Sequence, residues 1–100
     1  MRFKKMKWEP YDPTWLIDLV KQQLPKEKWL PDALAKCIRC MRESEAYIFF
    51  VNGKKANEPG SQWCFDHNLE LNCPNEGWLI LDILKDKQIG GLEFVDKIRS

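Results

Sequence analysis

The sequence lacks long apolar segments, which excludes one class of protein at once. No apolar run approaches the ~20 residues that a membrane-spanning helix needs. The basic start, residues 1–8, has the charge of a secretory signal. Residues 9–13 then bring Glu, Asp and two Pro instead of an apolar segment. We therefore expect a cytoplasmic protein without membrane contact.

The chain also lacks internal repeats and low-complexity stretches, and its 100 residues leave no length for a second core. Hydrophobic residues make up 44% of it and include five Trp, which is enough to bury a core without covalent cross-links. We predict one α+β domain over residues 1–100, in which residues 1–13 form a partly flexible basic segment.

Histidine is nearly absent, since His67 is the only one, and this limits the chemistry available. Structural zinc sites use two close ligand pairs, but only Cys37 and Cys40 are closely spaced, and both fall in an expected helix. Eight residues separate Cys64 from Cys73. Residues three apart in a strand face opposite ways, so Cys64 should not meet His67. We predict free thiols, no metal, no cofactor and no catalytic residues.

Two helices are predicted in the first half. Thr14 can cap a helix that Pro25 ends, and its apolar positions recur at helical spacing: Trp15, Leu16, Leu19, Val20 and Leu24. Pro31 suits the first turn of a second helix. Its apolar stripe would contain Leu34, Cys37, Ile38 and Met41, with Lys36, Arg39 and Arg42 facing away.

The second half reads as strands separated by turns. Apolar and β-branched runs occur at residues 47–51, 63–71, 78–84 and 89–95, and Asn52-Gly53, Pro59-Gly60 and residues 73–77 are turn signals between them. The predicted fold is therefore α+β, with two N-terminal helices packed on a four-stranded antiparallel meander.

The last two strands predict a face with a mixed character. If Leu84 pairs with Ile89, counting outward pairs Ile83 with Gly90, Leu81 with Leu92 and Leu79 with Phe94 on an apolar face. The opposite face then pairs Asp82 with Gly91 and Ile80 with Glu93. Gly91 should leave space beside Asp82 for a partner. The same face would also carry Trp78, Leu84, Ile89 and Val95, which fits either a docking surface or a surface covered by a loop.

Charge divides the chain into two unequal halves. Residues 1–42 hold ten Lys/Arg and five Asp/Glu, whereas residues 43–100 hold six and ten, so the halves carry +5 and −4. Arg2, Lys4, Lys5 and Lys7 interleave with Phe3 and Trp8, as in proteins that bind single strands. Because the whole chain is nearly neutral, at +1, we do not expect nucleic acid as the partner.

The segment from Leu79-Ile80-Leu81-Asp82 to Gly91-Leu92-Glu93-Phe94-Val95 resembles a C-terminal hairpin of small bacterial proteins of unknown function. In size, α+β order and charge, the chain is similar to the small immunity proteins encoded beside bacterial toxins, including those of contact-dependent inhibition systems. The second resemblance implies a non-catalytic antitoxin-type inhibitor that occludes the active site of a cognate toxin, and a nuclease with a basic cleft would suit its charge.

We predict that the acidic half makes the interface. Charge would come from Asp66, Glu70, Asp82, Asp86 and Glu93, with Trp63 and Trp78 as anchors. Two alternatives remain open: a homodimeric housekeeping module that packs the same face, and a small enzyme that uses Asp82 and Glu93.

Overall fold

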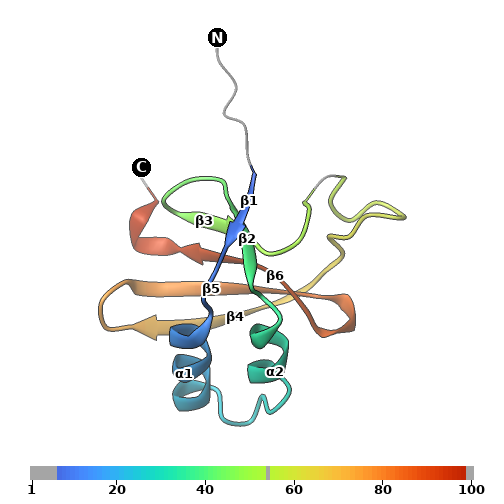
Figure 1. The fold of residues 1–100 in the computed structure, drawn as a ribbon. Coiled ribbons are helices and arrows are strands. Elements are labelled where there is room, and N and C mark those ends of the chain that lie inside the picture. The colour runs from blue at the N-terminus through green and yellow to red at the C-terminus, as the bar shows by residue number, and fades with distance from the viewer. Residues whose placement is uncertain (1–6, 54, 99–100) are drawn as a thin grey trace.

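The computed structural model describes residues 7–53 and 55–98, which form one antiparallel sheet and two short helices (Figure 1). The six strands lie in the order β1-β2-β3-β6-β5-β4. In chain order the elements are β1 (Trp8–Pro10), α1 (Thr14–Gln23), α2 (Leu30–Ala35), β2 (Arg39–Arg42), β3 (Tyr47–Phe49), β4 (Phe65–Cys73), β5 (Gly77–Leu84) and β6 (Gln88–Phe94), with 3₁₀ turns at Lys85–Lys87 and Val95–Lys97. The α+β class is confirmed, but the four-stranded meander is wrong.

The second helix is much shorter than predicted. It ends at Ala35, so Cys37 follows it and Cys40 lies in β2, not in a helix. The helical spacing of Cys37, Ile38 and Met41 is overridden because β2 gains two neighbours, β1 and β3. Ile38 shows the consequence, since 62% of its surface is exposed where a helix stripe would have buried it.

Part of the N-terminal segment belongs to the sheet. Residues 8–10 form the edge strand β1, in which Trp8 pairs with Met41 of β2. The Tyr11 N–H donates to the Ile38 carbonyl at 2.8 Å, and Arg42 forms an ion pair with Glu9 at 2.9 Å. These contacts hold residues 8–11 along β2. Residues 1–6 of the predicted flexible segment lie outside the described residues.

The β5–β6 hairpin has the predicted register along most of its length. Leu79–Phe94, Ile80–Glu93, Leu81–Leu92 and Asp82–Gly91 are confirmed as pairs. Near the turn the prediction is wrong, because Ile83 pairs with Ile89 and Leu84 with Gln88, leaving Gly90 as an extra residue. This β-bulge turns Ile89 toward the core, instead of the outer face where counting had placed it.

The core lies between the two helices and one side of the sheet, and Figure 1 shows both helices on that side. Leu81 is fully buried and Phe94 is nearly so, as predicted. Leu16, Val20, Leu30 and Leu34 come from the helices and their ends, and they pack with Leu71, Leu79, Ile83 and Leu92. Burial of these side chains fixes which face of each strand points away from the helices.

Strand β4 is the long edge of the sheet, with β5 as its one neighbour. The Gln23 side chain, at the end of α1, pairs with the β4 backbone. Its amide nitrogen donates to the Asn72 carbonyl at 2.6 Å, and its amide oxygen accepts from the Asn72 N–H at 2.8 Å. Gln23 therefore occupies one site on the outer edge of β4, and the Asn57 side chain accepts a hydrogen bond from the Phe65 N–H at the start of the strand. No helix within the described residues has the length and apolar character to span a bilayer.

Candidate protein-binding surface

The candidate surface lies on the side of the sheet away from the helices, over strands β3, β6, β5 and β4, and we call this part the open face. Its outward side chains are Tyr47 and Phe49 on β3, Glu93 on β6, Trp78, Ile80 and Asp82 on β5, and Asn68, Glu70 and Asn72 on β4. Three of these described side chains are acidic and none is Lys or Arg, although Arg39 of β2 lies on the same side of the sheet beyond β3. The open face is therefore negative, although the chain as a whole is nearly neutral.

Strand pairing arranges the carboxylates around an apolar centre. Tyr47 pairs with Glu93, Glu93 with Ile80, and Ile80 with Glu70, so one row crosses four strands. Ile80 consequently has a carboxylate on each neighbouring strand. Trp78 is two residues from Ile80 on the same face and is 50% exposed, which is unusual for the largest apolar side chain.

Asp82 is held within the sheet by two neighbours. The Tyr47 hydroxyl donates to Oδ2 at 2.6 Å, and the Asn68 amide donates to Oδ1 at 2.5 Å. Burial raises the pKa of Asp82 above its ordinary value, although both hydrogen bonds act in the opposite direction. Burial and the adjacent carboxylate raise the pKa of Tyr47, so its hydroxyl stays protonated and remains a donor. Asp82 therefore organises the face more than it presents a free charge.

Gly91 makes room for Tyr47, not for a partner as the sequence suggested. A Cβ at this position would collide with the Tyr47 hydroxyl and would lie 2.7 Å from the Ile48 carbonyl oxygen. The tyrosine ring thus fills the space that the missing side chain leaves. This contact allows the hydroxyl to reach Asp82 on the next strand.

The end of the open face near the β5–β6 turn is covered by the chain itself. The Phe49 ring lies 4.7 Å from that of Tyr47 and 5.6 Å from that of Trp63, centroid to centroid. Trp63 and Leu84 both lie over Gly90, where a Cβ would be 2.8 Å from each. Leu84 is 1% exposed although it lies outside the main core. Both readings of this face therefore apply, each to a different part: a loop covers one end and the rest is open.

The structure brings four of the seven predicted interface residues together. Glu70, Trp78, Asp82 and Glu93 share the open face, and Trp63 packs at its covered end.

The other two predicted residues lie apart from that group. Asp66 sits in the irregular part of β4, where its carboxylate is 3.2 Å from His67 Nδ1. Asp86 lies in the β5–β6 turn and lines a cleft beside α2. These two residues were predicted from their charge alone, and the charge of a residue does not indicate where it lies in the fold.

Sequence reasoning missed Tyr47 and Asn68, the two partners of Asp82. Tyr47 was expected in a strand, and alternation from Ile48 would have placed it outward. Its neighbour could not be inferred, because β3 pairs with β6 across more than forty residues of sequence. Asn68 does pair with Asp82 across the β4–β5 hairpin, so a register count from the turn at residues 73–77 could have found it.

The cysteines form no site among the residues that the structure describes. All four are free thiols, and Cys37, Cys40 and Cys73 are buried. Burial raises the pKa of the Cys37 thiol to about 12 and also raises that of Cys40. No cluster of three or more His, Cys, Asp or Glu side chains suited to a metal ion occurs in residues 7–53 and 55–98.

Comparisons with known protein families, with curated proteins and with solved structures find no match to this chain.

Proposed function

We propose that this protein is a non-catalytic binding domain that captures a basic protein on its open face. More specifically, we propose a cytoplasmic bacterial inhibitor of the immunity type, which blocks the active site of a cognate toxin. The observation that carries the proposal is the half-exposed Trp78 beside Glu70 and Glu93, on a face without Lys or Arg among its described side chains. The size, charge and element order of the chain support the immunity-type reading.

Charge and burial would act at different stages of binding. Glu70 and Glu93 lie on either side of Ile80, so their combined field attracts a cationic cleft and accelerates association. Trp78 and Ile80 then supply apolar area that leaves water in the complex, which slows dissociation. Asp82 holds the sheet surface rigid through Tyr47 and Asn68, so little ordering is required on binding.

The test is a titration of the purified protein against the product of the neighbouring gene at two salt concentrations. Glu70→Lys, Glu93→Lys and Trp78→Ala should each weaken capture at least about tenfold, because a reversed charge adds repulsion and a lost anchor removes buried area. Lys21→Glu, on the exposed side of α1, is the matched control and should bind like the wild type.

Each alternative outcome has a distinct meaning. Capture that fails in Lys21→Glu but survives in the open-face variants would place the interface on the helical side. Self-association that hardly depends on salt and is lost in Trp78→Ala would identify the open face as a homodimer interface. If the neighbouring product does not bind at all, the inhibitor function is refuted.

A further inference from the structure

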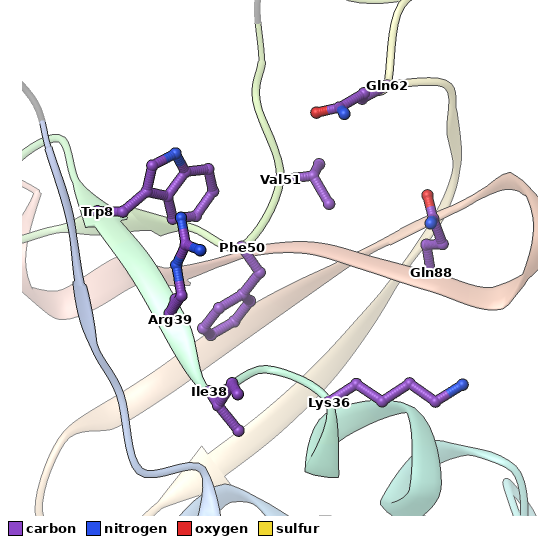
Figure 2. A pocket seen from close by; sticks show the side chains of 8 residues that line it. All are labelled: Trp8, Lys36, Ile38, Arg39, Phe50, Val51, Gln62 and Gln88. Atoms are coloured by element: carbon purple, nitrogen blue, oxygen red, sulfur yellow. The ribbon is translucent and has the colours of Figure 1, made fainter.

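A second site lies beyond β3, where the start of β2 meets the segment after β3 and the start of β6. It is an open pocket of about 480 Å³, a size typical of small-molecule sites. Figure 2 shows its eight lining side chains: Trp8, Lys36, Ile38, Arg39, Phe50, Val51, Gln62 and Gln88. The proposed protein interface uses none of them.

The polar groups around this pocket suit an anion. Lys36 and Arg39 line it, and none of its eight described lining residues is acidic. Gln62 and Gln88 contribute amides, which can both donate and accept hydrogen bonds. Figure 2 shows Trp8 and Arg39 on one side of the pocket, with both glutamines and the Lys36 ammonium on the other. A ligand between them would meet positive charge at both ends.

The aromatic and apolar groups suit a flat ring. The Arg39 guanidinium carbon lies 5.1 Å from the centre of the Trp8 ring, which gives a stacked cation–aromatic pair. Trp8 is 37% exposed and Ile38 is 62% exposed, so both keep apolar surface available at the rim. Phe50 is fixed, because its N–H donates to the Gly90 carbonyl at 2.8 Å and its ring packs 5.2 Å from that of Tyr11.

A neighbouring cleft of about 390 Å³ extends the pocket along the end of α2. The two adjoin, because Lys36, Phe50, Val51 and Gln88 line both, and we call them together the groove. This cleft adds Lys87, whose ammonium lies 5.6 Å from the centre of the Trp29 ring, together with Asp86. Three cations and one carboxylate line the whole groove, which continues the positive potential beyond Lys36.

We propose that this groove binds a nucleoside diphosphate. The base would stack at the Trp8–Arg39 pair, with the glutamine amides available to its edge, and the phosphates would lie toward Lys36 and Lys87. Stacking on an aromatic ring combined with cations for phosphate is the chemistry that nucleotide-binding surfaces use. The groove has room for a single nucleotide and few cations, which favours a free nucleotide over a nucleic-acid strand.

The experiment is calorimetric titration of the wild-type protein with ADP at low salt. Adenosine, inorganic pyrophosphate and an eight-nucleotide single-stranded RNA are the comparison ligands. ADP should bind more tightly than either adenosine or pyrophosphate, because each lacks one of the two recognised groups. Lys36→Gln, Arg39→Gln and Trp8→Ala should each weaken ADP binding at least about tenfold, since each removes a charge-assisted contact or the stacking surface.

Control variants separate this site from the open face. Glu70→Lys and Lys21→Gln should bind ADP as the wild type does, and circular dichroism should show that every variant is folded. Equal affinity for adenosine and ADP would refute the phosphate contacts, and equal affinity for pyrophosphate and ADP would refute the stacking contact. RNA binding without ADP binding, or no binding at millimolar ADP, would overturn the proposal.

Discussion

Replacing Gly91 with alanine tests the arrangement at the centre of the open face. The backbone at Gly91 does not need a positive φ, so alanine is compatible with its conformation. The added Cβ nevertheless collides with the Tyr47 hydroxyl and comes within 2.7 Å of the Ile48 carbonyl oxygen. Tyr47 must move, and the movement breaks its hydrogen bond to Asp82.

The free energy of unfolding should fall by about 1–3.5 kcal/mol. Overpacking at a tight site costs about 1–3 kcal/mol. Loss of the hydrogen bond to a partly exposed carboxylate adds about 1 kcal/mol. The smaller entropy of the unfolded alanine chain offsets about 0.4–1 kcal/mol of this. For a chain of this length, each kcal/mol lowers the melting temperature by about 4–8 °C.

Urea unfolding followed by tryptophan fluorescence measures this loss, and Tyr47→Phe supplies the control. Phenylalanine removes both the colliding oxygen and the hydrogen bond, so Gly91→Ala should cost at least about 1 kcal/mol less in that background. An equal loss in both backgrounds would show that the Tyr47 hydroxyl is not the cause. A loss below about half a kcal/mol in the wild type would refute the close contact itself.

Three further predictions concern single side chains. Leu81→Ala should cost about 2–5 kcal/mol in urea unfolding because Leu81 is fully buried, and a loss below about half a kcal/mol would contradict the β5–β6 register. Burial raises the pKa of Asp82 above 3.8. The stability that this shift contributes is present below pH 3.8 and is lost as the pH rises through the raised pKa. The free energy of unfolding, measured across this pH range, should therefore decline less in Asp82→Asn than in the wild type. Cys37, with its pKa raised to about 12, should react with iodoacetamide at pH 8 far more slowly than the partly exposed Cys64, which mass spectrometry of the labelled peptides can measure.

Prediction from sequence succeeded where neighbours in the chain are also neighbours in space. Alternation and one short turn were enough to place Asp82 and Glu93 on one face, because β5 and β6 form a hairpin. The bulge at Gly90 was missed, since a hairpin count assumes one residue opposite one residue. The first helix, with Thr14 near its start and Pro25 beyond its end, was also predicted nearly to its observed length.

Prediction failed where distant segments determine the structure. Residues 39–42 have helical spacing but become a strand, because β1 and β3 supply hydrogen-bond partners that no local pattern reveals. Tyr47 was not linked to Asp82, because that contact requires β3 to pair with β6, and β4 and β5 lie between these two strands in the sequence. Choosing interface residues by their charge correctly included Glu70, which lies on the open face, but it also included Asp86, which lies in the β5–β6 turn.

The Gln23 side chain links the docking of helix α1 to the solubility of the chain. While α1 is in place, its terminal amide satisfies the Asn72 backbone on the outer edge of β4. When α1 detaches, the Asn72 backbone loses its hydrogen bonds to Gln23, and Leu71 and Leu79 lose their packing against α1 at the same time. An uncovered nine-residue edge strand is a template for pairing with other chains. The earliest aggregates of this protein should therefore form from molecules that have released one helix, well before the sheet itself unfolds.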